Sequence, residues 1–121
     1  MPEDVWKGLN RVKDKANKTD LEKKHIPTIH APSEVKAREP FEVKIMVGEE
    51  LAHPDEGAHH IQWVELFAGE AFLSRIDFTP TVSTSPITLT LKLNEDTVLK
   101  AHARCNLHGV WENSHPLKVH K

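Results

Sequence analysis

The 121-residue sequence contains a single cysteine, Cys105, and no extended hydrophobic segment. One cysteine excludes an internal disulfide, a zinc ribbon and any redox motif built on a cysteine pair. No apolar run approaches the ~18 residues that a membrane-spanning helix needs, so we expect no membrane span. The first residues, Met1 to Trp6, lack the basic and apolar stretches of a secretory signal. With its unpaired thiol, the chain is predicted to be cytoplasmic.

An excess of positive charge is also missing. The chain has 16 Lys and Arg and 18 Asp and Glu, a formal net charge of −2 and a pI near 6.5. A general nucleic-acid binder carries a basic excess, so nucleic acid is not an expected partner. The length is that of one domain, and it is sufficient to bury a core without disulfides.

The first 24 residues differ in composition from the rest, with seven Lys or Arg and five Asp or Glu. Val5, Trp6, Leu9 and Val12 follow a roughly helical spacing, so the segment is either a short amphipathic helix or a mobile polar stretch. We therefore divide the chain into a polar N-terminal segment, residues 1–20, and a folded domain, residues 21–121.

From about residue 35 onward, apolar and polar side chains alternate, which predicts half-buried β-strands. The runs are 41–47, 61–67, 72–78, 87–93, 99–105 and a short last one at 117–120. In the run 72–78, the alternation places Phe72, Ser74 and Ile76 on the inward face. Turn residues separate the runs and no helical pattern lies between them, so we predict an all-β protein, an antiparallel β-sandwich or barrel.

Histidine is unusually abundant, with nine residues in the chain. His53 and His59 lie between two predicted strands, where Pro54 and Gly57 disfavour a helix, and a loop can bring both rings to one point. His25 lies in another loop, ahead of the sheet. Other histidines are predicted to be solvated surface residues, on an outward strand face, in turns or near the C-terminus: His30, His102, His115 and His120.

Cys105 and His108 form a Cys-x-x-His sequence, a short chelate that recurs in metal sites. Cys105 continues the inward face of its strand, so its sulfur is predicted to point toward the core, and Gly109 allows a tight turn. Imidazole and thiolate suit iron, copper or zinc, and not magnesium or calcium. Blue copper also takes a weak axial methionine, but no methionine follows Cys105. The residues alone leave an iron or copper electron carrier and a structural zinc site open.

Three segments together resemble the superoxide reductases, a family that includes neelaredoxins and the iron domain of desulfoferrodoxins. They are His25-Ile-Pro27, the segment from His53 to His60, and Cys105-Asn-Leu-His108-Gly-Val-Trp111-Glu112, which agree in order and spacing over residues 22–121. The resemblance implies an immunoglobulin-like sandwich of about seven strands. It also implies a mononuclear iron with four histidines in a plane, His25, His53, His59 and His108, and the Cys105 thiolate on the axis. A single cysteine matches the one-iron class.

The function implied by this resemblance is one-electron reduction of superoxide to hydrogen peroxide. The family also implies an external electron donor such as rubredoxin, and a homo-tetramer. Lys24 occupies the position of a family lysine that points toward the open metal position. The family glutamate that binds ferric iron has Lys23 in its place here, and Glu22 lies one residue earlier, so Glu22 takes that role only if the loop shifts by one residue. The competing function is a non-catalytic, cupredoxin-like electron-transfer domain.

Overall fold

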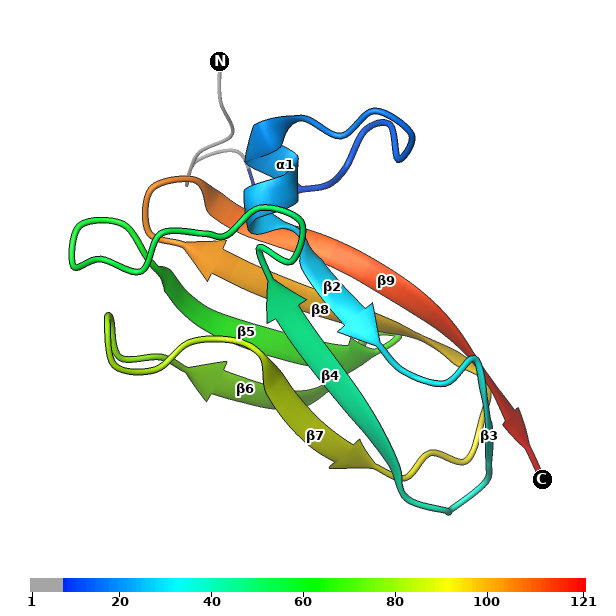
Figure 1. Cartoon of the computed structure of the whole chain (residues 1–121). Coiled ribbons are helices and arrows are strands. Elements are labelled where there is room, and N and C mark those ends of the chain that lie inside the picture. Colours follow the sequence, from blue (N-terminus) through cyan, green and yellow to red (C-terminus); the bar gives the residue numbers. More distant parts are fainter. Residues whose placement is uncertain (1–7) are drawn as a thin grey trace.

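The computed structural model of the chain describes residues 8–121, which form a pair of β-sheets packed face to face (Figure 1). The smaller sheet has the order β2-β4-β7, formed by β2 (Pro27–His30), β4 (Phe41–Val47) and β7 (Ile87–Leu91). The larger sheet has the order β1-β9-β8-β5-β6, and β3 pairs with β9 beside this path. Its strands are β1 (Leu9–Asn10), β3 (Glu34–Lys36), β5 (Ile61–Ala68), β6 (Ala71–Asp77), β8 (Thr97–Cys105) and β9 (Gly109–His120).

The all-β sandwich predicted from the sequence is confirmed, with two differences in detail. Residues 8–121 form nine strands where about seven were expected. The long strands pair antiparallel, whereas β1 and β3 run parallel to β9. These two strands have only two and three residues, so they are too short to produce a visible alternation in the sequence.

The core lies between the two sheets and is built by the alternating residues of their central strands. β4 contributes Val43 and Ile45, and β8 contributes Leu99, Ala101 and Ala103, all with no exposed surface. The inward phase continues to the end of β8. This packing fixes the position of the last inward residue, Cys105, which is also fully buried.

The prediction for the run 72–78, most of which lies in β6, was wrong at its first residue. Phe72 is 57% exposed, and Leu73 packs against the core instead. The cause is a register shift between Leu66 and Phe67, since Leu66 pairs with Ser74 while Phe67 pairs with Phe72. A β-bulge adds one unpaired residue and exchanges the two faces of the strand beyond it. Phe72 therefore lies on the outer face, with its ring 5.7 Å from that of Phe67.

The short amphipathic helix, one of the two expectations for the N-terminal segment, is not found at the described residues with that spacing. Val5 and Trp6 lie outside the described residues, Leu9 belongs to β1, and Val12 follows in a loop. A short helix, α1 (Asp20–His25), is found instead directly before β2. It begins with a capping box, in which the Thr19 hydroxyl accepts from the backbone N–H of Glu22, and the Glu22 carboxylate accepts from that of Thr19.

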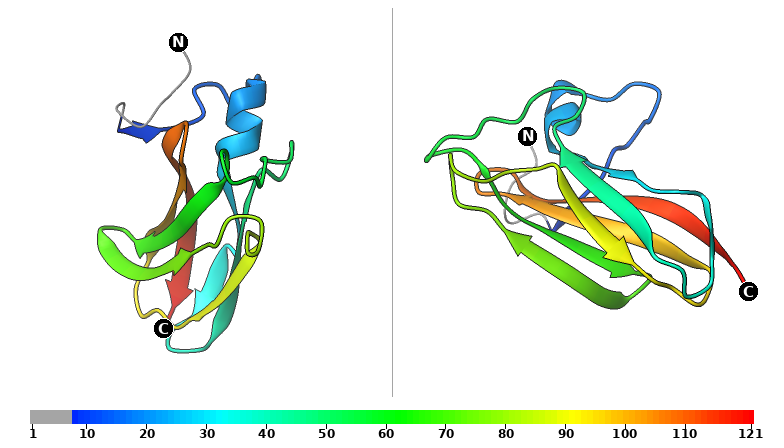
Figure 2. Two further views of the ribbon diagram at one scale, coloured as in Figure 1. Left: turned by 90° about the vertical axis from the view of Figure 1, so that its left-hand side faces the viewer. Right: turned by 60° about the horizontal axis from the view of Figure 1, so that its bottom comes forward.

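One end of the sandwich gathers three connecting segments that are far apart in the sequence. These are α1, the loop between β4 and β5, and the turn between β8 and β9 (Figures 1 and 2). These segments and the last residue of β8 hold all the predicted ligand residues, so the candidate site lies at this end of the sandwich. Among the described residues, no helix has the length and apolar character needed to cross a membrane.

Candidate metal centre

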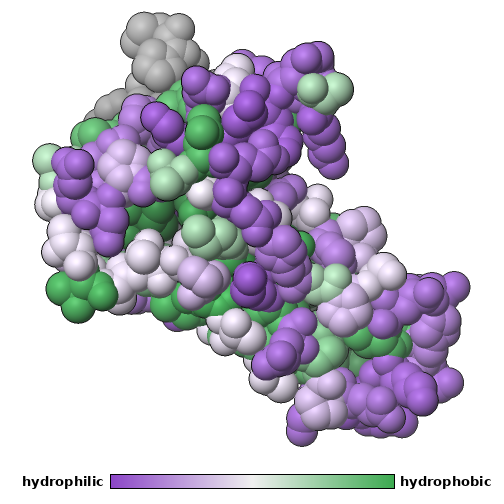
Figure 3. All heavy atoms as spheres, viewed as in Figure 1, coloured by the Kyte–Doolittle hydropathy of each residue, from purple (hydrophilic) through white to green (hydrophobic). Residues whose placement is uncertain are grey.

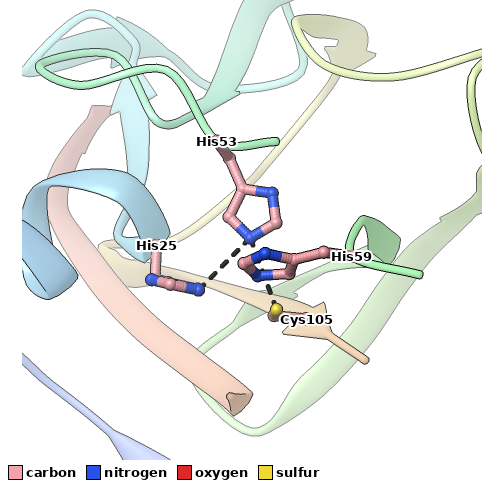
Figure 4. Close-up of side chains that lie close together, drawn as sticks. All are labelled: His25, His53, His59 and Cys105. Carbon is pink, nitrogen blue, oxygen red and sulfur yellow. Dashed lines mark hydrogen bonds between the residues drawn. The ribbon is translucent and has the colours of Figure 1, made fainter. Parts of the chain in front are cut away.

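Four of the predicted ligands meet at this end of the sandwich. One ligand atom each from His25, His53, His59 and Cys105 lie within 4.8 Å of one another. Figure 4 shows that they come from three separate elements: α1, the β4–β5 loop and the end of β8. Sequence positions 25 and 105 are joined here only by the fold, so the cluster is a product of the tertiary structure.

The spacing within the cluster fits ligands that share one metal ion. His53 Nε2 lies 3.2 Å from His25 Nε2 and 3.3 Å from Cys105 Sγ. Two ligands at about 2.1 Å from an ion and at right angles to each other are about 3 Å apart. Adjacent ligands of a common ion therefore account for both contacts.

Hydrogen bonds on the far side of two rings orient them toward the cluster. His25 Nδ1 lies 2.7 Å from the carbonyl of Leu21, and His53 Nδ1 lies 2.7 Å from that of Pro54. Carbonyls only accept, so each Nδ1 carries the proton and each Nε2 presents its lone pair to the centre. His59 Nε2 is buried and has no hydrogen-bond partner among the described residues. A buried nitrogen without a partner is costly unless something else, such as a metal, binds it.

His108 lies at the margin of the same cluster. Its ring centroid is 4.8 Å from that of His25 and 5.1 Å from that of His59. Its Nδ1 lies 3.7 Å from Cys105 Sγ, although His108 is not part of the tightest group of four. Gly109 follows with a φ of +81°, a left-handed conformation that favours glycine and closes the Cys-x-x-His turn.

The loop that carries His53 depends on Gly48 at its start. The φ of Gly48 is +73°, and a Cβ there would lie 2.7 Å from the backbone nitrogen of His53. Further along, Glu56 and His59 exchange backbone hydrogen bonds of 2.9 and 3.1 Å, which form a tight turn. Both rings are thus placed by backbone geometry.

Asn106 joins the second half of this loop to the Cys105–His108 turn. Its Nδ2 donates to the carbonyl of Ala58 and its Oδ1 accepts from the N–H of His60, both at 2.9 Å. Ala58 and His60 are the two neighbours of His59, so Asn106 holds the backbone on both sides of that residue. The sequence prediction gave Asn106 no such role, because Asn106 and Ala58 are 48 positions apart and the sequence does not show that they meet.

Trp111 packs against the cluster. It is 1% exposed, and its ring stacks on that of His25 with centroids 5.1 Å apart and planes 22° apart. Its indole N–H donates to the carbonyl of His108 at 3.1 Å. One buried side chain therefore contacts two of the predicted ligands.

The electrostatics of the cluster favour neutral imidazoles. Burial lowers the pKa of His25 to about 3 and that of His53 to about 4. It lowers the pKa of His59 as well. Burial raises the pKa of the Cys105 thiol, although the backbone N–H groups of Leu107 and His108 act in the opposite direction. Neutral imidazole is the form that binds a metal, so the histidines need no deprotonation at neutral pH.

A pH prediction follows for the metal-free protein. Because His25 and His53 have folded-state pKa values below the ordinary 6.5, the unfolded chain binds more protons in acid. Their stabilisation is complete above pH 6.5 and is lost as the pH falls toward 4 and 3. At pH 5.5 the two histidines together lower the free energy of unfolding by roughly 3 kcal/mol relative to neutral pH. Urea unfolding at pH 7.5 and 5.5 measures this, and a His25→Gln/His53→Gln variant with the same loss between these pH values would contradict it.

Lys24, the residue before His25, lies close enough to the cluster for its charge to act there. Burial and the neighbouring histidines are the larger causes that lower the pKa of His53 and of His59. The charge of Lys24 lowers both pKa values further. Lys23 lies elsewhere, in a surface recess that Lys15, Lys18 and Glu50 also line. Figure 3 shows hydrophilic side chains gathered over α1 and the loop before it.

Glu22 is not brought into the cluster. Its side chain is buried, with one carboxylate oxygen accepting from the N–H of Thr19 at 2.9 Å and the other from that of Lys13 at 3.2 Å. Both oxygens are thus engaged at the start of α1. The four histidines predicted to be at the surface all have other partners: His30 with Glu49, His102 with Glu112, His115 with the Pro32 carbonyl and His120 with Glu34.

Known proteins are similar to this chain in both sequence and fold. Residues 17–114 match the Desulfoferrodoxin family. A protein from Methanocaldococcus jannaschii is 46% identical over 109 residues, covering 87% of this chain and 89% of that protein. The superoxide reductase of Pyrococcus furiosus is 37% identical over 108 residues, covering 74% and 85%. A solved structure of the superoxide reductase (neelaredoxin) from Ignicoccus hospitalis has a TM-score of 0.81 and 40% identity, covering 92% and 94%.

These matches extend over most of the chain and include the α1, loop and turn segments that form the cluster. The chain therefore belongs to the desulfoferrodoxin family, as the three sequence segments indicated. The His and Cys cluster is a group of side chains that could hold a metal ion.

Proposed function

We propose that this protein is a superoxide reductase, which reduces superoxide to hydrogen peroxide with one electron from an external donor. The observation that carries the proposal is the meeting of His25, His53, His59 and Cys105 within 4.8 Å in a member of the desulfoferrodoxin family. The relatives named superoxide reductase support the same activity. Superoxide, one electron and two protons together give one hydrogen peroxide, so no dioxygen is formed.

We propose iron as the metal, with His108 as a fourth histidine ligand beside the group of four. Three or four imidazoles with one thiolate suit iron, and when bound it would supply the electron that superoxide accepts. The neutral rings hold the ion without adding charge. The buried Cys105 sulfur, which would bind as thiolate, increases the electron density at the centre.

The cupredoxin alternative needs a methionine near Cys105. Met46 is the one methionine among residues 8–121, and its sulfur lies 3.5 Å from the hydroxyl of Ser85. It belongs to β4, in the sheet opposite that of Cys105. This position gives no support to an axial thioether, so the structure favours iron chemistry over blue copper.

The product ratio tests the proposed function. Protein loaded with ferrous iron without air is mixed with superoxide, and hydrogen peroxide and dioxygen are measured together. A reductase gives one peroxide for each superoxide and no dioxygen. A dismutase gives one peroxide and one dioxygen for every two superoxides, and that ratio, or the absence of any reaction, would overturn the proposal.

We propose that Lys24 attracts superoxide to the site. A unit charge about 6 Å from an approaching anion contributes about 0.7 kcal/mol in water, so Lys24→Ala is expected to slow the bimolecular reaction roughly threefold at low salt. The difference from the parent should decrease as salt is added, because the Debye length falls below 10 Å above about 0.1 M. Pulse radiolysis at two salt concentrations measures both effects.

Lys23→Ala is the matched control for this prediction, because Lys23 lies in the recess with Lys15 and Lys18. It is expected to change the rate less than Lys24→Ala does. Equal rates in the parent and in the double variant would remove the steering role from both lysines.

For Glu22 we propose a role in the helix cap and not as an iron ligand, since its two oxygens accept backbone hydrogen bonds. An unchanged ferric spectrum in Glu22→Ala would support this. The electron donor is proposed to be a small redox protein such as rubredoxin, and the assembly a homo-tetramer. Reduction kinetics with that donor and sedimentation of the full chain test these two points.

A further inference from the structure

The described end of the N-terminal segment, residues 9–13, lies against the candidate metal centre. β1 pairs in parallel with the first residues of β9, with Leu9 opposite Val110 and Asn10 opposite Trp111 (Figure 2). The side chain of Asn10 is directed inward, and the residue is only 5% exposed. A buried amide in a polar segment needs a specific set of partners.

Asn10 finds these partners on the backbone that follows His108. Its Nδ2 donates to the carbonyl of His108 at 3.3 Å and to that of Val110 at 3.1 Å. The indole N–H of Trp111 donates to the same His108 carbonyl. Two buried donors from different regions of the chain therefore hold one carbonyl, that of a proposed ligand.

The same segment also reaches the element that carries His25. The backbone N–H of Lys13 donates to the Glu22 carboxylate at 3.2 Å, and Glu22 lies in α1, which ends at His25. Between these two attachments, Arg11 forms an ion pair of 2.7 Å with Glu112 on β9. Residues 9–13 thus connect the Cys105–His108 turn with α1, and we call them the strap.

We propose that Asn10, held in place by the strap, is a positioning residue of the metal centre and acts through the His108 carbonyl. Asn10 fixes the backbone of His108 directly, and the pairing of β1 with β9 brings Asn10 to that carbonyl. The inference rests on the proposed metal site, but it concerns contacts that this chain forms by itself. Groups that orient ligands without touching the metal commonly change metal affinity by about 10- to 100-fold when removed.

The experiment compares Asn10→Ala and Asn10→Asp with Arg11→Ala. All three change the strap, but only the first two remove the donor to the His108 carbonyl. Asn10→Asp keeps the size of the side chain, so an effect that both variants show is not caused by the lost volume in Asn10→Ala. Iron release to a chelator and the energy of the visible thiolate-to-ferric band are measured in the full-length, iron-loaded protein. Amide hydrogen exchange of residues 105–110 is measured without metal.

Both Asn10 variants are expected to release iron about tenfold faster or more and to shift the visible band, while Arg11→Ala keeps both close to the parent. Exchange of residues 105–110 should increase in the metal-free Asn10 variants. Parent-like release, band and exchange in both Asn10 variants would overturn the proposal. An equal band shift in Arg11→Ala would also overturn it, since docking of the strap alone would then explain the effect. If the parent binds no iron, the proposed function fails, and the exchange measurement still decides the role of Asn10.

Discussion

Cys105→Ser is expected to leave a folded protein that has no visible thiolate band and no superoxide reductase activity. The side chain is fully buried at the end of β8, and the hydroxyl differs little in volume from the thiol. Serine also retains a hydrogen-bonding group on the side of His53 Nε2, which lies 3.3 Å from the sulfur. What is lost is the soft, electron-donating ligand, because an alcohol does not ionise as a thiol does.

The measurements for Cys105→Ser are the absorption spectrum of the oxidised protein, the rate with superoxide and the far-UV spectrum. Ala103→Ser is a matched control, since it places a hydroxyl at the preceding inward position of the same strand and leaves the sulfur in place. It should keep the band. A Cys105→Ser variant that reduces superoxide at the parent rate would show that the thiolate is not required.

The alternation of apolar residues predicted most of the sandwich, because each long strand has one face in the core. In β4 and β8 the alternating positions are the buried ones, Val43 and Ile45 in one and Leu99, Ala101 and Ala103 in the other. The same phase predicted that Cys105 points inward, so the direction of the proposed axial ligand was readable from the strand pattern.

Other features leave little or no trace in such a pattern. The bulge that exposes Phe72 depends on the pairing of β5 with β6, which a single strand does not encode. β1 is two residues long and is defined only by its partner. The helix α1 did leave a local signal, since Thr19 and Glu22 have the spacing of a capping box. The expectation of a helix did not include that signal and rested only on the apolar spacing of residues 5–12.

The site was predictable as a set of residues but not as an arrangement. Spacing alone suggested that His53 and His59 share a loop, and the resemblance to the superoxide reductases supplied the rest. Asn106 holds the backbone on both sides of His59, and Asn10 holds the backbone after His108. These hydrogen bonds join residues that are 46 to 100 positions apart. Such contacts arise only when the two sheets have packed, so the order of residues along the chain does not contain them.

His53→Ala and His59→Ala are expected to lower iron affinity by more than about 100-fold, since each removes a proposed ligand where loss of a supporting group alone costs about 10- to 100-fold. His53 Nε2 lies 3.2 Å from His25 Nε2, and His59 Nε2 is buried without a partner among the described residues, so each alanine variant removes one nitrogen from the cluster. His102→Ala and His120→Ala are the controls, because these rings bind Glu112 and Glu34 instead. Iron per chain after dialysis against a chelator should be low in the first pair and equal to the parent in the second. Equal iron in all four variants would mean that the metal is held somewhere other than this cluster.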